Sequence, residues 1–131
     1  MEEKKIREDI LYPELSYEII GCAFEVFNEL GPGHLERTYE RAMAVGFIKR
    51  GIKFKEQVYY PIKFEGETVG NNYFDFFVDD KVIVELKCGT HFTRANFQQV
   101  HKYLAVSGKK LAILITFTKD GVIQKRVVND Y

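Results

Sequence analysis

The sequence predicts an α/β (α+β) domain in which helices flank a central mixed β-sheet. Apolar residues recur every three to four positions in the first third of the chain, then alternate with polar residues from about position 58, which marks a change from helix to strand. The 131 residues, 46% hydrophobic and 15% aromatic, suit one packed core. A helical pattern separates the third and fourth of five strand-like segments, so these two strands can run parallel. The expected order is ααβββαββ.

Two amphipathic helices are expected first, over residues 14–30 and about 34–50. Gly31, Pro32 and Gly33 end the first helix, because glycine tolerates left-handed backbone angles and proline cannot continue the turn. Gly51 is the expected cap of the second helix. The stripes expected to face the core are Leu15, Ile19, Cys22, Ala23, Val26 and Leu30, then Leu35, Tyr39, Ala42, Met43, Gly46 and Phe47.

The five expected strands cover residues 58–64, 72–78, 82–88, 110–117 and 122–128. Pro61 places the first of them at a sheet edge or irregularity, because proline cannot donate to a strand ladder. The nearly continuous apolar run of the fourth predicts a central strand covered on both faces. Thr93 is the expected N-cap of a third helix over 93–106. We expect a single domain over residues 1–131, with 1–12 loosely attached.

The hairpin formed by the second and third strands decides which side chains share a face. A three-residue connection, 79–81, pairs Val78 with Val82 and sets Asp75 directly opposite Glu85. A two-residue turn would instead send Glu85 to the other face. We choose the first register because it buries together Phe74, Phe76, Val78, Val82, Val84 and Leu86.

Two opposed carboxylates repel unless something positive lies between them, and a hard divalent cation meets that need. Mg²⁺ is usually held by one or two carboxylates together with waters and substrate phosphate. Asp75, Glu85 and the Leu86 backbone carbonyl could provide the protein ligands, with Lys87 on the same face beside a phosphoryl oxygen or an attacking water. A solvated outer face is the alternative interpretation. A partly enclosed pocket is favoured by the apolar residues on that face, Tyr73, Phe77 and Ile83.

Two motifs carry a resemblance to a known family. Asp75 followed by Glu85-Leu86-Lys87 across a hairpin resembles the core of the PD-(D/E)XK nuclease superfamily. The segment Gly33-x-x-Glu36-x-x-Tyr39 resembles the GxxExxY proteins, a branch of that superfamily, and the similarity extends from about Leu15 to Asn129.

The resemblance implies a restriction-endonuclease-like PD-(D/E)XK core and a role for each matched residue. It implies that Asp75 and Glu85 are catalytic metal ligands, that Glu36 contributes to the metal site, and that Lys87 is the catalytic lysine. It also implies that Gln99, Tyr103 and Tyr39 lie near the substrate. Packing or one hydrogen bond is the alternative for Tyr39, and plain helix surface is the alternative for the other two.

The leading hypothesis is therefore a Mg²⁺-dependent nuclease, with Mn²⁺ as a substitute, that hydrolyses phosphodiester bonds in DNA or RNA by means of a metal-activated water. The chain has nineteen basic and nineteen acidic residues, which argues against coating nucleic acid through bulk charge and leaves a non-catalytic nucleic-acid- or protein-binding module as the alternative. A small-molecule phosphoesterase is less favoured, because no glycine-rich phosphate loop is present. A local basic rim could come from Arg94, Lys102, Lys109 and Lys110.

The remaining expectations concern the setting of the protein. Cys22 and Cys88 have neither metal-ligand nor disulfide-framework spacing, and buried thiols in a reducing compartment are expected. We expect a cytoplasmic protein, because the sequence shows no signal peptide and no apolar run of membrane-spanning length. A homodimer is one expectation, since a chain this small often needs a second copy to span a duplex.

Overall fold

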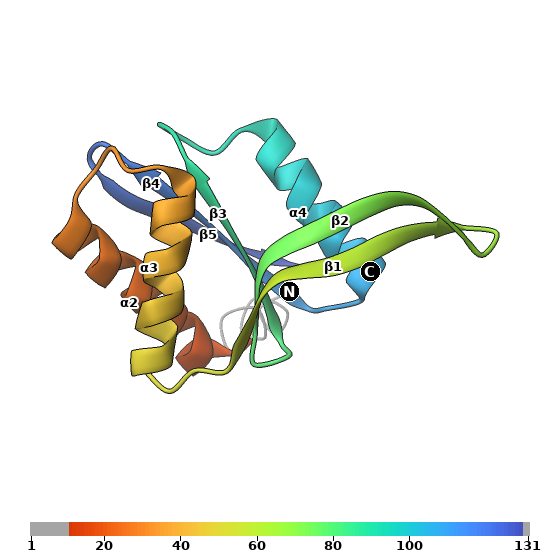
Figure 1. Ribbon diagram of the computed structural model, residues 1–131, viewed down its shortest axis with the longest axis horizontal. Coiled ribbons are helices and arrows are strands. Elements are labelled where there is room, and N and C mark those ends of the chain that lie inside the picture. Colours follow the sequence, from red (N-terminus) through yellow and green to blue (C-terminus); the bar gives the residue numbers. More distant parts are fainter. Residues whose placement is uncertain (1–10, 130–131) are drawn as a thin grey trace, which may run out of the picture.

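The computed structural model describes residues 11–129, and the predicted fold class and element order are confirmed (Figure 1). The elements are helices α2 (Pro13–Leu30), α3 (Glu36–Lys49) and α4 (Arg94–Ser107) and strands β1 (Phe54–Phe64), β2 (Glu67–Val78), β3 (Val82–Cys88), β4 (Leu111–Thr118) and β5 (Gly121–Val128). Thr93 caps α4 as predicted, in a reciprocal capping box with Asn96.

The five strands form one sheet in the order β1-β2-β3-β4-β5. β3 and β4 run parallel, joined through α4, and the other neighbouring strands are antiparallel. β1 is an edge strand and β4 is central, as predicted. Because α2 and α3 cover one face of the sheet and α4 covers the other, the molecule has three layers, with the β1–β2 hairpin projecting beyond them (Figure 1).

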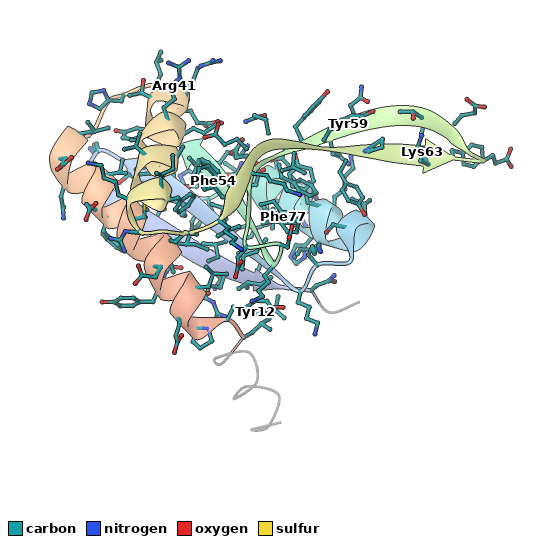
Figure 2. The ribbon with its side chains drawn as sticks, turned by 60° about the horizontal axis from the view of Figure 1, so that its bottom comes forward. Tyr12, Arg41, Phe54, Tyr59, Lys63 and Phe77 are labelled. Atoms are coloured by element: carbon teal, nitrogen blue, oxygen red, sulfur yellow. The ribbon has the colours of Figure 1, made fainter. Side chains whose placement is uncertain are left out.

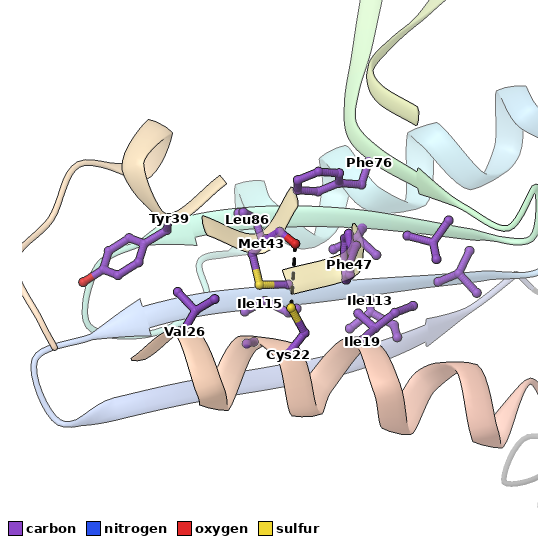
Figure 3. Packing of buried hydrophobic residues seen from close by; sticks show 14 of the residues in the cluster. Ile19, Cys22, Val26, Tyr39, Met43, Phe47, Phe76, Leu86, Ile113 and Ile115 are labelled. Atoms are coloured by element: carbon purple, nitrogen blue, oxygen red, sulfur yellow. Dashed lines mark hydrogen bonds between the residues drawn. The ribbon is translucent and has the colours of Figure 1, made fainter. Parts of the chain in front are cut away.

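Each face of the sheet has its own hydrophobic cluster. On the face that we call the α2–α3 face, the helices pack over β2, β3 and β4, and Cys22 Sγ donates to the Met43 carbonyl oxygen at 3.7 Å within this core (Figure 3). On the opposite face, the α4 face, Val100, Tyr103 and Leu104 pack over a smaller group of strand residues. The two clusters account for the strict alternation in β3, where the α2–α3 face takes Val82, Val84 and Leu86 and the α4 face takes Ile83.

Leu35 was predicted to face the core, and this prediction is wrong: its exposed fraction is 78%. Leu35 is the N-cap of α3 and has an extended backbone, with φ −65° and ψ 150°, so it lies outside the helical stripe that it was assigned to. The rest of that stripe is confirmed by buried Tyr39, Met43, Gly46 and Phe47.

The β1–β2 hairpin is longer than predicted, because β1 begins at Phe54 rather than 58 and β2 at Glu67 rather than 72. The missed residues of β1, 54–57, lie at the inner end of the hairpin, where Phe54 pairs with Val78, and the missed residues of β2, 67–71, lie near its tip. Both stretches are mostly exposed, so neither carries the apolar–polar alternation of a half-buried strand. Figure 2 shows Tyr59 and Lys63 out on this projecting hairpin.

Phe74 was predicted to share a core with Phe76 and Val78, and this prediction is also wrong. Phe74 belongs to the α4-face cluster, with its ring centroid 4.6 Å from that of Tyr103, whereas Phe76 belongs to the α2–α3 face. The change of face coincides with Gln57 on β1, which lies between the Glu56↔Phe76 and Val58↔Phe74 pairs. Its φ of 46° departs from the extended backbone of the rest of the strand. The hairpin turns at this point, so the period of two does not carry across it.

The expected loose segment 1–12 lies outside the described residues except for Leu11 and Tyr12, which pack against the α2–α3 core. Within the described range, no helix has the length and apolar character that a membrane span requires.

Candidate active site

The site is built where β2 and β3 separate. The two strands pair at Phe76↔Val84, Phe77↔Ile83 and Val78↔Val82, which confirms the predicted register around the three-residue connection. One residue further, side chains replace the backbone ladder: the Asp75 N–H donates to Glu85 Oε1 at 2.8 Å, and the Leu86 N–H donates to Asp75 Oδ2 at 2.8 Å. The two carboxyl groups are thus held side by side, each fixed by the other strand's backbone.

Gln57 joins three elements at the same point. Its Nε2 atom donates to Asp75 Oδ1 at 3.3 Å and to the two carboxylate oxygens of Glu40 at 3.2 and 3.1 Å. The turn of the hairpin at Gln57 therefore brings β1 and α3 to the carboxyl pair. Sequence reasoning missed this residue, because a single glutamine in a strand carries no signal of a left-handed backbone angle.

Burial makes the ionised pair unfavourable. Glu85 is only 3% exposed, and burial, followed by the negative charge of Asp75, raises its pKa to about 8. Burial also raises the pKa of Asp75 to about 6, opposed by the Leu86 N–H and reinforced by Glu40 and Glu36. A positively charged ligand between the carboxylates would lower both pKa values again, because it would stabilise the ionised forms.

Lys87 lies two residues after Glu85 on β3, and its positive charge acts on Glu85 to lower that carboxyl's pKa. The lysine side chain is half-buried, and within the described chain its ammonium forms neither an ion pair nor a hydrogen bond. The structure therefore brings Asp75, Glu85 and Lys87 to one place, at the end of the α4 face.

Glu36 enters the site from the α2–α3 side of the sheet. As the first residue of α3, it is close enough to raise the pKa values of both Asp75 and Glu85. The loop before it is fixed by Tyr39, whose hydroxyl donates to the Gly31 carbonyl at 2.7 Å and accepts from the His34 N–H at 3.3 Å.

Tyr39 itself is 1% exposed, and its ring stacks on Phe117 with centroids 4.1 Å apart. The contacts of Tyr39 are those of packing and hydrogen bonding, which was the alternative left open for this residue in the sequence.

Two α4 residues approach the carboxyl pair from the opposite side. Burial raises the pKa of Tyr103 to about 12, and the charges of Glu85 and Asp75 add to the shift, which places the phenol within electrostatic reach of both. Gln99 lies close enough to Tyr103 to oppose this rise and lower the pKa of the phenol. The helix thus presents Gln99 and Tyr103 near the site rather than to open solvent.

Asp75 also lines an open hollow of about 660 Å³, which lies between α3 and the bend of the β1–β2 hairpin at Gln57. Its other lining residues are Glu36, Arg37, Glu40, Arg41, Glu56 and Gln57. Sequence reasoning missed Arg37 and Arg41, although their spacing of four residues predicts one helix face. None of the residues expected to form a basic rim lines this hollow, and one of them, Lys109, lies 4.9 Å over the Phe77 ring instead.

The donor set fits a hard divalent cation. Among residues 11–129, no group of three or more His, Cys, Asp or Glu side chains is already close enough to enclose a metal. The two adjacent carboxylates with raised pKa values nevertheless match the one or two carboxylates that commonly hold Mg²⁺ beside water and phosphate, and Glu36 lies within electrostatic reach of both.

Comparison with known proteins gives one family and several structural neighbours. A family model described as the PD-(D/E)XK nuclease superfamily matches residues 13–128. A search of curated protein sequences found no significant match.

Among solved structures, the chain is similar to an alkaline exonuclease, LHK-Exo, from Laribacter hongkongensis (TM-score 0.52, 15% identity), covering 72% of this chain and 55% of that one. It is also similar to SSO0001 (TM-score 0.58, 13% identity; 98% and 63% covered) and to LHK-Exo in complex with dAMP (TM-score 0.50, 11% identity; 88% and 82% covered). The chain thus spans less than two thirds of the first two neighbours, and at these identities the likeness shows a shared fold.

Proposed function

This chain belongs to the PD-(D/E)XK nuclease superfamily, and from that premise we propose that it is a divalent-metal-dependent nuclease acting on DNA or RNA. The observation that carries the proposal is the reciprocal pair formed by Asp75 and Glu85, in which each carboxylate is fixed by the opposite strand while burial and repulsion make its charge unfavourable. A buried acidic pair with strongly shifted pKa values beside an unpaired lysine is an arrangement typical of a functional site.

Asp75 and Glu85 would hold Mg²⁺ or Mn²⁺, with the Leu86 carbonyl as a further ligand and Glu36 contributing directly or through water. When bound, the metal would make water a stronger nucleophile and offset negative charge on the phosphate. Lys87 would place its ammonium beside a non-bridging phosphate oxygen, where charge develops during cleavage. The same ammonium lowers the cost of ionising Glu85, so it also favours the protonation state that binds metal.

Arg37 and Arg41 would bind the phosphate backbone, because both line the hollow that reaches Asp75 and guanidinium groups pair well with phosphate. Gln99 and Tyr103 would contact the substrate from α4. The family supports nucleic acid as the substrate, and the dAMP complex of LHK-Exo agrees with a nucleotide-binding fold.

Membership of the GxxExxY branch is part of the proposal. Gly33 has a φ of 90°, which favours glycine, and Tyr39 holds the loop that leads into Glu36. The other two motif residues therefore each have a physical part in presenting Glu36. The proposal further includes a single domain over 1–131, a cytoplasmic location and a homodimer able to span a duplex.

The test is cleavage of end-labelled single-stranded DNA, duplex DNA and RNA with Mg²⁺, with Mn²⁺ and with a chelator. Wild-type protein is expected to cleave one of these polymers with metal only, and Asp75→Asn, Glu85→Gln and Lys87→Met are each expected to lower the rate by about 100-fold or more. Asp80→Asn, in the exposed connection between β2 and β3, is the matched control and should retain full activity.

Metal titration by calorimetry separates the alternatives. Weaker Mn²⁺ binding by Asp75→Asn and Glu85→Gln, together with lost cleavage, supports the site. Cleavage that persists in all three variants would reject these residues. Failure of the wild type both to bind metal with an oligonucleotide present and to cleave would favour a non-catalytic binding module.

A further inference from the structure

Thr116 is a buried polar residue with no visible partner. It lies in the central strand β4, its exposed fraction is 0%, and its Oγ atom has no hydrogen-bond partner among residues 11–129. A hydroxyl that is withdrawn from water and left unpaired lowers stability, so the side chain requires an explanation. Valine has nearly the same shape and would avoid the cost.

The alternation of β4 places Thr116 on the α4 face. Ile113, Ile115 and Phe117 belong to the α2–α3 cluster, whereas Ala112 and Leu114 belong to the α4-face cluster. Thr116 continues the second series, so it points to the same side as Glu85 and Lys87. It is therefore a polar end to an otherwise apolar row.

The sheet register identifies the immediate neighbours of Thr116. Lys87 of β3 is its partner on one side, and Ile123 of β5 is its partner on the other. Ile123 has no polar side-chain atom, so Lys87 is the one polar neighbour in this row of the sheet. Lys87 has three donors and no acceptor, while the threonine hydroxyl can accept. Each of these adjacent groups lacks a partner within the described chain.

The two groups are not hydrogen-bonded to each other in this structure, and we propose that reorientation of the half-buried Lys87 side chain brings its ammonium to Thr116 Oγ, which accepts a hydrogen bond and thereby positions the ammonium at the candidate site. Because Thr116 is fully buried, it cannot touch a substrate and acts through Lys87 alone: it is a positioning residue. Its effect on cleavage rests on the proposed nuclease function, whereas the hydrogen bond itself does not.

The bond is tested first without activity, by denaturant unfolding of metal-free protein in a cycle of Thr116→Val and Lys87→Met. With Lys87 present, Thr116→Val should lower the unfolding midpoint, because a hydrogen bond to a charged group is lost. In the Lys87→Met background the same change should raise the midpoint, because it removes an unpaired buried hydroxyl. An equal shift in both backgrounds would overturn the proposal, since the two groups would then be independent.

Thr118→Val is the matched control. Thr118 is on the same strand, but its hydroxyl is fully engaged, donating to the Gly121 carbonyl at 2.8 Å and accepting from the Asp120 and Gly121 N–H groups at 3.1 Å. Its substitution should lower the midpoint by the same amount with or without Lys87.

Kinetics then test the positioning role. Thr116→Val should lower kcat by about 10- to 100-fold with little change in KM, the range set by one hydrogen bond to a charged group. Thr116→Ser, which keeps the hydroxyl, should restore kcat to within about threefold of wild type. Unchanged kcat in Thr116→Val, or equal losses in the valine and serine variants, would overturn the role.

The two proposals fail in different ways. If the wild type cleaves no polynucleotide, the nuclease proposal fails and the unfolding cycle still decides whether the hydroxyl binds Lys87. If the wild type cleaves and Lys87→Met does not, normal cleavage by Thr116→Val would reject the positioning role alone.

Discussion

The two faces of the sheet are built from the same strands but carry different chemistry. On the α2–α3 face, β3 and β4 contribute only apolar side chains, ending in Leu86 and Phe117. On the α4 face the same strands begin with Ile83 and Ala112 and then turn polar, with Glu85, Lys87 and Thr116. The change occurs at the carboxyl ends of the parallel pair, where β2 separates from β3.

This difference shows how a small protein keeps costly groups in its interior. A nearly dry glutamate and an unpaired threonine each lower stability, and the larger α2–α3 cluster offsets them. The period of two makes the division possible, because neighbouring residues on one strand can serve folding and chemistry separately.

The strongest way to break the comparison is to truncate adjacent residues of β4 that face opposite sides. Ile113 and Leu114 are both fully buried, one in each cluster. Ile113→Ala and Leu114→Ala should each lower the free energy of unfolding by about 2–5 kcal/mol, measured by denaturant melts.

The two substitutions should differ in their effect on the candidate site. Leu114 is the register partner of Glu85, so a cavity at Leu114 should loosen the carboxylate and weaken Mn²⁺ binding in calorimetry. Ile113→Ala should bind Mn²⁺ as wild type does, at a temperature where both variants are folded. Equal losses of metal affinity would show that the faces are not separable.

A second prediction concerns the charge cost on the α4 face. Glu85 has a raised pKa in the folded protein, so folding takes up a proton between the unfolded value of 4.5 and about 8. The stability gained from this proton uptake is fully present below the unfolded pKa and is lost as the pH rises through the folded pKa. Metal-free wild type should therefore lose about 2 kcal/mol between pH 6 and 8, whereas Glu85→Gln should lose much less.

Urea melts at pH 6, 7 and 8 measure this difference, and saturating Mg²⁺ at pH 8 supplies the control. The ion should restore stability to the wild type and leave Glu85→Gln nearly unchanged, because ligands stabilise only the state that they bind. Parallel pH profiles for the two proteins would contradict a burial penalty on Glu85.

Much of the fold could be predicted from the sequence, because hydrophobic period and turn chemistry are local signals. The boundaries of β3, the capping of α4 by Thr93 and the Val78–Val82 register all follow from a few neighbouring residues. Residues 54–57 of β1 and 67–71 of β2 could not be predicted as strand, because these stretches are mostly exposed and leave no apolar pattern.

The site was predictable where it lies on regular strands and obscure where the backbone departs from them. Asp75 and Glu85 were found through the period of two. The position of Gln57 in the site depends on its positive φ, which a glutamine in the sequence does not predict. The same turn moved Phe74 to the other face. Arg37 and Arg41 were overlooked because their role depends on how α3 packs against that turn, which is a tertiary property.

The smallest expected effect concerns Tyr39, which links the α2–α3 core to the site. Tyr39→Phe keeps the ring stacked on Phe117 but leaves the Gly31 carbonyl and the His34 N–H without the hydroxyl. The free energy of unfolding should fall by about 1 kcal/mol. Because the freed loop leads directly into Glu36, Mn²⁺ affinity should also fall by a few-fold.

The control is Tyr17→Phe, which changes an exposed tyrosine of α2 and should alter neither the free energy of unfolding nor the Mn²⁺ affinity. Loss of stability without loss of metal affinity would mean that the loop does not position Glu36, and the two faces would then be independent at this end of the sheet as well.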